Sequence, residues 1–239
     1  MMRVLVLGVS LLFLSSSVEA QTDTDRRLQR ASQVFSEIMA APDRGIPRDL
    51  LERAHCVVIV PGMLKGAFVV GAQYGKGFAF CRSSRGIGWS NPAAVRMEGG
   101  SVGFQIGGQE TDIIMLVMNP RGMDRLMTSR FTIGGDASAA AGPVGRTTQA
   151  QTDAMMTAEL LTWSRSRGLF AGISLNGATL RPAEQDNKDL YGRELNTRQV
   201  LTTRLPTPES ARPLLAQLSR FSFTTSGPTE ADRQIQQQQ

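Results

Sequence analysis

The residues Gly99-Gly100-Ser101-Val102-Gly103 match the G-x-S-x-G pattern of a serine nucleophile letter for letter. Such a nucleophile needs a strand before it, a helix after it and a histidine base further along the chain. Here the following residues, Phe104-Gln105-Ile106-Gly107, resemble a strand, and the single histidine, His55, lies upstream in an apolar run. We therefore predict a glycine-rich β-turn at Ser101, and a serine hydrolase is the least favoured of three functional hypotheses.

Other catalytic and metal-binding patterns also fail. Gly75-Lys76 lacks the glycine five residues earlier and the following Ser or Thr that a phosphate-binding loop requires. One histidine and two cysteines cannot build a multi-histidine site or a zinc ribbon. Asp112 and Asp136 lie in apolar or glycine-rich surroundings, where we expect buried structural carboxylates rather than catalytic ones. The sequence thus predicts a protein that is not an enzyme and needs no metal or cofactor.

Positive charge is the chemistry that remains. The chain has 26 Lys+Arg against 21 Asp+Glu, a net charge of +5, and only 3 of these basic residues are lysines. Arginine binds phosphate with two parallel hydrogen bonds, so its excess favours an anionic ligand. Three clusters stand out: Arg26-Arg27-Arg30, Arg146 at the end of Gly142-Pro143-Val144-Gly145, and Arg165-Ser166-Arg167. Each cluster could equally be a solvated surface without a ligand.

The first twenty residues have the pattern of a secretory signal peptide. Arg3 precedes an apolar run over residues 4–14, and Val18-Glu19-Ala20 suits a cleavage site. A run of about 11 residues is too short to span a membrane. We predict a mature chain from about Gln21, without a transmembrane helix, exported to the periplasm, the outer envelope or the medium. Export argues against nucleic acid as a partner, as does the lack of aromatic residues among the basic ones.

Export also bears on the two cysteines. Cys56 and Cys81 both lie in apolar, strand-like runs. In an oxidising compartment such a pair favours a disulfide over a redox or metal site. Two buried free thiols remain the alternative, because sequence alone cannot show that the two side chains meet.

The elements that must position these residues form a single α+β domain. The 24 glycines and 11 prolines indicate many tight turns. A strand-rich region is expected over residues 55–182, with one helix inside it at 120–129. Two helices precede this region, at 24–41 and 48–54, and two follow it, at 183–191 and 208–218. We expect a mostly antiparallel, barrel-like sheet with helices at both ends of the chain. The domain is placed at residues 21–225, before a disordered Gln-rich tail at 226–239.

Three local patterns make sharper predictions. Leu28, Ala31, Phe35, Ile38 and Met39 form an apolar stripe on the first helix, which could pack on the sheet or lie in a lipid interface. Asn176-Gly177 between two apolar runs predicts a β-hairpin. A tight turn over residues 164–168 predicts a second hairpin between the strands on either side of it.

Many ordered motifs resemble the SYLF-domain family, a lipid-binding module of yeast and animal actin-patch proteins and of many exported bacterial proteins. They are Val60-Pro61-Gly62, Lys65-Gly66-Ala67-Phe68-Val69-Val70-Gly71, Tyr74-Gly75-Lys76-Gly77, Gly88-Trp89-Ser90-Asn91-Pro92, Gly100-Ser101-Val102-Gly103-Phe104-Gln105-Ile106-Gly107, Thr111-Asp112, Gly134-Gly135-Asp136-Ala137-Ser138, Ala141-Gly142-Pro143-Val144-Gly145-Arg146 and Ser164-Arg165-Ser166-Arg167-Gly168-Leu169-Phe170-Ala171-Gly172. The resemblance covers residues 28–201.

The resemblance implies a non-enzymatic module that binds acidic phospholipids through a basic surface and an amphipathic N-terminal helix. The candidate lipid-binding residues are Arg26, Arg27, Arg30, Lys65, Arg146, Arg165 and Arg167. Because this chain carries a signal-peptide pattern, phosphoinositide specificity and actin regulation are not expected to carry over. Phosphatidylglycerol, cardiolipin or lipopolysaccharide phosphates are the expected ligands. The alternative is a structural or partner-binding envelope protein without lipid affinity.

Overall fold

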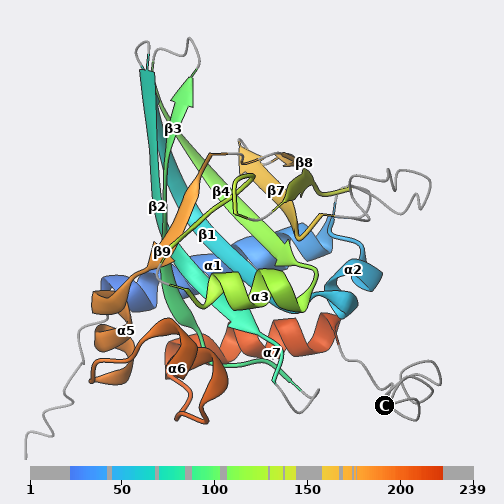
Figure 1. Ribbon diagram of the computed structural model, residues 1–239. Coiled ribbons are helices and arrows are strands. Elements are labelled where there is room, and N and C mark those ends of the chain that lie inside the picture. Colours follow the sequence, from blue (N-terminus) through green and yellow to red (C-terminus); the bar gives the residue numbers. More distant parts are fainter. Residues whose placement is uncertain are drawn as a thin grey trace, which may run out of the picture.

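A computed structural model describes most of the chain after residue 21. The described residues are 22–41, 45–67, 70–83, 88–102, 107–128, 130–136, 138–143, 158–166, 169–173, 175 and 177–222. The expected signal peptide, the expected tail, Arg146 and Arg167 lie outside them. Figure 1 shows a curled, half-barrel sheet with helices packed against it. The prediction of an α+β domain with N- and C-terminal helices is confirmed.

The sheet is antiparallel except at one edge. Its order is β5-β9-β3-β2-β1-β4-β7-β6, with β8 paired to β7, and only β6 and β7 run parallel. The strands are β1 (Cys56–Ala67), β2 (Val70–Cys81), β3 (Ala93–Val102), β4 (Gly107–Val117), β5 (Phe131–Thr132), β6 (Ala139–Ala141), β7 (Leu160–Ser166), β8 (Leu169–Gly172) and β9 (Thr179–Pro182). The four long central strands β3, β2, β1 and β4 are neighbours.

The central strands continue through glycines, although glycine within a strand pattern often marks a break. In β1, Gly62 has φ +61°, and the pairing register with β4 shifts between Val60 and Met63. This shift is a β-bulge, which lets a strand pass a Pro-Gly pair without ending. In β2, a Cβ at Gly77 would lie only 2.0 Å from the carbonyl oxygen of Ile59. Glycine is therefore required there by the close approach of β1.

The helices lie mostly where the sequence predicts them. They are α1 (Asp23–Ala40), α2 (Arg48–Arg53), α3 (Pro120–Leu126), α5 (Glu184–Tyr191), α6 (Thr197–Thr202) and α7 (Arg212–Phe221), with a 3-10 turn η2 (Glu209–Ala211) before α7. Thr22 caps α1 in a reciprocal capping box with Asp25. Helix α6 was not predicted, although Asn196 and Gln199 form the same kind of box at its start.

Alternation along the strands divides the apolar core into two clusters. Val57 and Ile59 face a cluster that includes α1, α2 and α7, whereas Val58 and Val60 face one that includes α3 and α6. Leu28, Ala31, Phe35 and Ile38 of α1 are each 0% exposed in the first cluster. The apolar stripe of α1 therefore packs into the core, and its arginines are left at the rim of the sheet.

One predicted hairpin is confirmed, and the turn of the other is present. Strand β7 pairs with β8, as the turn over residues 164–168 predicted. Gly177 forms a turn, with φ +85°, and across it the Ala178 amide donates to the carbonyl of Leu175 over 3.1 Å. Ser174 and Asn176 of the expected hairpin lie outside the described residues. Strand β9 also pairs with β3 and β5, and the Gly177 amide donates to the carbonyl of Ile133 over 2.8 Å.

The predicted disulfide is confirmed. Cys56 and Cys81 are direct partners in the register of β1 and β2, with their Cα atoms 4.0 Å apart and their sulfurs bonded at 2.03 Å. Both residues are buried, at 0% and 2% exposure. The bond joins the two strands at the end of the sheet where α2 enters β1.

Candidate functional site

Helix α1 crosses the central strands. One of its edges faces the end of the sheet opposite the disulfide, which we call the open end. From its N-terminus, Arg27 pairs with Asp186 of α5, which also binds Lys76 of β2. Further along the helix, Arg30 pairs with Glu110 of β4 and Glu37 pairs with Arg165 of β7. These positions border the buried stripe, so the side chains lie where the helix meets the sheet surface. We call the charged residues along this edge the ion-pair row: Arg27, Arg30, Glu37, Lys76, Glu110, Asp112, Arg165 and Asp186.

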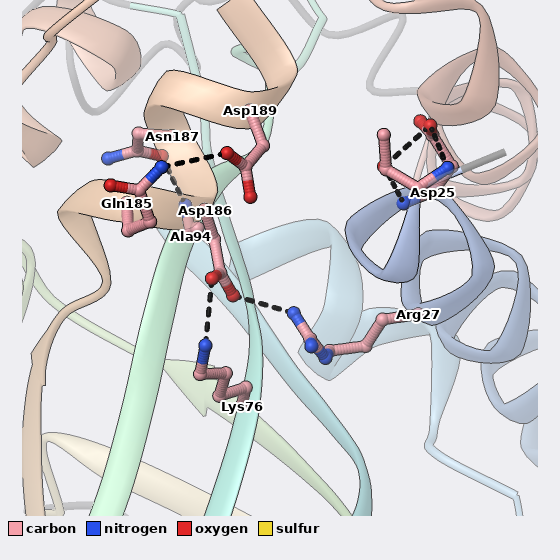
Figure 2. Close-up of polar contacts among 9 residues, drawn as sticks. Asp25, Arg27, Lys76, Ala94, Gln185, Asp186, Asn187 and Asp189 are labelled. Carbon is pink, nitrogen blue, oxygen red and sulfur yellow. Dashed lines mark hydrogen bonds and ion pairs between the residues drawn. The ribbon is translucent and has the colours of Figure 1, made fainter. Parts of the chain in front are cut away.

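Asp186 of α5 holds two cations at one end of the row. It accepts from Arg27 over 2.6 Å and from Lys76 over 2.8 Å, and Figure 2 shows both side chains reaching its carboxylate. The Asp186 side chain is only 5% exposed. The next residue, Asn187, accepts from the Ala94 amide over 2.7 Å and so ties α5 to β3. Arg27, a predicted lipid-binding residue, is therefore part of a structural ion pair.

We expect Asp186→Asn to lower the free energy of unfolding by about 3 kcal/mol, because it leaves two half-buried cations facing each other without a counter-charge. Asp189→Asn is the matched control, since this carboxylate on the same helix is exposed and accepts from the neutral Gln185 side chain. The control should change stability by less than about 0.5 kcal/mol. Urea unfolding of both variants checks this, and equal losses would contradict the role of the ion pair.

Arg165 of β7 lies in a second network at the other end of the row. Its guanidinium donates to Asp112 over 2.7 Å, pairs with Glu37 and lies 5.5 Å from the centre of the Phe170 ring. Asp112 also accepts from the Gly62 amide over 2.8 Å, which holds the bulge of β1. Burial raises the pKa of Asp112, against the lowering effects of the Gly62 hydrogen bond and of Arg30. Burial, with the nearby charge of Arg30, lowers the pKa of Arg165.

Arg30 lies between these two networks, and its side chain is far more exposed than those of Arg27 and Arg165. It pairs with Glu110 of β4, and their side chains are 58% and 51% exposed. A Cβ at Gly62 would lie 2.6 Å from the Glu110 carboxylate and 3.0 Å from the Arg30 guanidinium. The pair thus lies directly over the backbone of the bulge, where glycine leaves room for it. Exposed pairs of this kind contribute about 0–1 kcal/mol, so Arg30 can exchange its partner at little cost.

The remaining predicted cations lie apart from one another. Arg26 is exposed on α1 and pairs with Asp23. Lys65 is half-buried on β1, where its register partners are Gln73 and Gln109, and no carboxylate pairs with it in the described part of the chain. Arg146 and Arg167 lie outside the described residues. The structure therefore brings Arg27, Arg30 and Arg165 into one row, places Arg26 on the same helix and leaves Lys65 on the other face of the sheet.

Two apolar side chains beyond the ion-pair row were not predicted as site residues. Leu64 and Tyr74 are direct partners on β1 and β2 and are 61% and 45% exposed. Figure 1 shows the long central strands extending past the helices at this end of the sheet. The bulge at Gly62 changes the alternation of β1, so a period-two pattern drawn through Val58 and Val60 could not assign Leu64 to this face.

The serine motif does not form a nucleophile elbow. Ser101 lies within β3 and pairs in register with Gly71, near the open end of the sheet. His55 precedes Cys56, whose partner Cys81 is ten residues further along β2 than Gly71, or roughly 34 Å at the rise of a strand. The histidine is therefore too far away to act as a base for Ser101.

A cavity of about 430 Å³ lies at the opposite end of the sheet, beside the disulfide. Trp89, Met123, Leu201 and Arg204 are among its lining residues. Arg82 also lines it, but its guanidinium donates to the carbonyls of four residues, Leu51, Glu52, Ala54 and Ser222. Arg82 thus joins the ends of α2 and α7 and has a structural role.

None of the helices in the described residues is long and apolar enough to cross a membrane.

Comparison with known proteins identifies the family. Residues 98–221 match the family model Ysc84, described as Las17-binding protein actin regulator. Rat SH3 domain-containing YSC84-like protein 1 is 31% identical over 202 residues, which are 83% of this chain and 58% of the relative. Yeast protein YSC84 is 29% identical over 213 residues, which are 87% of this chain and 45% of the relative.

The human SH3 domain-containing YSC84-like protein 1 is likewise 31% identical over 191 residues, 79% of this chain and 55% of its own length. The chain thus spans about half the length of the curated relatives it matches. The family model covers more than half of the chain and includes β4, β7 and α5, which contribute Glu110, Asp112, Arg165 and Asp186 to the ion-pair row. This chain belongs to the Ysc84 family of SYLF-domain proteins, as a distant homologue of its yeast and mammalian members.

Proposed function

We propose that this chain is a non-enzymatic protein that binds anionic phospholipid surfaces peripherally. The observation that carries the proposal is the exposed arginine edge of α1. Arg26 and Arg30 have side chains that are 61% and 58% exposed, and their carboxylate partners are exposed to a similar degree. A lipid phosphate can replace such a partner, because an exposed ion pair is weak and arginine binds phosphate through two hydrogen bonds.

The location of the protein decides which lipids it meets. The signal-peptide pattern of residues 1–20 supports export to the periplasm, the outer envelope or the medium. In that setting, phosphatidylglycerol, cardiolipin and the phosphates of lipopolysaccharide are the anionic headgroups within reach. Family membership supports lipid binding in general terms, and the choice of headgroup belongs to this proposal alone.

Arg27 and Arg165 have a different part in the proposed function. Both are tied to carboxylates that are 5% and 10% exposed, so exchange with a phosphate would leave a buried charge unpaired. They hold α1 against the sheet and thereby fix the positions of Arg26 and Arg30. The apolar stripe of α1 has no part in lipid contact, because it is buried.

We expect Arg26→Gln/Arg30→Gln to weaken binding to anionic vesicles by about thirtyfold, since each arginine near an anionic surface contributes about 1 kcal/mol. Co-sedimentation with vesicles of phosphatidylcholine and phosphatidylglycerol measures this, with pure phosphatidylcholine vesicles as the reference. Arg193→Gln/Arg198→Gln is the matched control, because it removes the same charge from exposed positions on and before α6. Wild-type binding should also fall as salt rises.

A partner-binding protein without lipid affinity is the alternative. The family description names Las17 binding and actin regulation, and that description favours a protein partner for the relatives it covers. The expected export of this chain makes actin a poor candidate here. Failure of the wild-type protein to sediment with anionic vesicles at low salt would favour this alternative and contradict lipid binding.

A further inference from the structure

Leu64 and Tyr74 form an exposed apolar pair on the face of the sheet against which α1 packs. The pair lies nearer the open end of the sheet than the part that α1 covers. Phe78 of β2 packs in the α1 cluster, and Lys76 on the same face reaches Asp186 beside Arg27. Alternation then places Tyr74 on this face, together with Leu64, its direct partner on β1. The described residues leave three large apolar side chains exposed, and two of them face each other here.

The described row that follows this pair on the central strands consists of small residues. The next row toward the open end pairs Gly66 with Ala72 and Gly108, and Ala72 with Gly100. Three of these four residues lack a side chain, and Ala72 is exposed. This row therefore does not cover Leu64 and Tyr74, which stay exposed.

Charged groups border the pair on the neighbouring strands β4 and β3. Glu110 is the register partner of Leu64 and pairs with Arg30, whose guanidinium lies over Gly62. Glu98 is the register partner of Tyr74, and its carboxylate lies 2.8 Å from Arg96 and 3.6 Å from Arg181. Three arginines thus meet two glutamates around two apolar side chains.

We propose that Leu64, Tyr74 and Arg30, the sheet-end patch, are where this protein enters an anionic bilayer. Leu64 and Tyr74 insert at the level of the headgroups, and Arg30 exchanges Glu110 for a lipid phosphate. Tyrosine suits this position, because its ring is apolar and its hydroxyl group stays hydrated. The patch combines exposed apolar side chains with an exposed cation, which fits the interface of an anionic membrane. This inference rests on the proposed lipid binding and names the side chains that perform it.

The first test removes the apolar pair. Leu64→Ala/Tyr74→Ala should weaken binding to phosphatidylcholine–phosphatidylglycerol vesicles by about tenfold or more, with an unchanged unfolding midpoint. The matched control is Leu169→Ala. Leu169 is 60% exposed on β8, and its neighbour Phe170 packs in the α1 cluster, so Leu169 faces the other way. The control should bind as the wild type does.

A second measurement reports insertion directly. In Leu64→Trp, vesicle binding should shift the added tryptophan emission to shorter wavelength, and lipids brominated on the acyl chain should quench it. Leu169→Trp should show neither change. The emission of the wild-type protein, with Trp89 and Trp163, is subtracted in both cases.

A third variant tests the exchange of partners at Arg30. Glu110→Gln should strengthen vesicle binding several-fold, because Arg30 no longer has a competing carboxylate. Glu209→Gln makes the same charge change at an exposed partner of Arg212 and should have a smaller effect. Equal gains from the two variants would overturn the exchange at Arg30.

The outcomes separate this inference from the proposed function. If the wild-type protein binds anionic vesicles and Leu64→Ala/Tyr74→Ala binds equally well, the sheet-end patch is wrong and lipid binding stands. If Leu64→Trp binds without any spectral change, insertion is wrong. If the wild-type protein does not bind at all, both the patch and the lipid function are wrong.

Discussion

Phe35→Ala is expected to lower the free energy of unfolding by about 3–5 kcal/mol, the usual cost of removing a buried phenylalanine. Phe35 is 0% exposed, and its ring meets that of Phe221 of α7 edge-on, with the ring centres 6.2 Å apart and the planes at 71°. The substitution leaves a cavity between α1, α7 and the sheet. Urea-induced unfolding followed by circular dichroism measures the loss.

Ser36→Ala is the control for this prediction, because it changes the next residue of α1 on the exposed face. Its effect on stability should stay within about 0.5 kcal/mol. A loss below about 1 kcal/mol for Phe35→Ala would contradict a core role for the stripe. It would also return α1 to consideration as a helix that inserts into lipid.

The fate of α1 illustrates what the sequence could predict. Its apolar period, its approximate ends and its arginines were all visible, because these depend on residues close together in the chain. Whether the stripe packs on the sheet or in lipid was left open, since that depends on α7 and on strands far along the chain. Phe221, for example, lies 186 residues beyond Phe35.

The candidate site was predictable only in part, for the same reason. Arg27, Arg30 and Arg165 could be singled out as cations, but their partners could not. Asp186 is 159 residues from Arg27, and Glu110 is 80 residues from Arg30. Charge clusters in a sequence show how many cations are near one another, whereas the fold decides how many of them are already paired.

Glycines likewise made the ends of the strands hard to predict. The pair Pro61-Gly62 by itself favours the end of a strand, because such pairs usually mark turns. In the structure the pair forms a bulge, held by the hydrogen bond from the Gly62 amide to Asp112. That bond comes from β4, so no local rule could anticipate it. The bulge in turn places Leu64 on the face of the proposed lipid contact.

Loss of the disulfide is expected to lower the free energy of unfolding by about 3.5 kcal/mol, on the chain-entropy account of cross-links. Cys56 and Cys81 are 25 residues apart, so the bond restricts a loop of moderate length in the unfolded chain. It also stabilises the end of the sheet where Cys81 donates to Ser90 over 3.0 Å and Arg82 joins α2 to α7. Urea unfolding of the wild-type protein with and without a reductant measures the change without altering any side chain.

Cys56→Ala/Cys81→Ala separates the cross-link from other effects of the reductant. This variant should unfold at a lower urea concentration than the oxidised protein, and its midpoint should not respond to reductant. Because both sulfurs are buried, reduction of the native protein should require partial unfolding, so reductant added in urea should act faster than reductant added in buffer. Rapid alkylation of both cysteines in the unfolded, unreduced protein would contradict the bond. Without it, the two strands that carry Leu64 and Tyr74 would rely on hydrogen bonds and packing alone to hold their register.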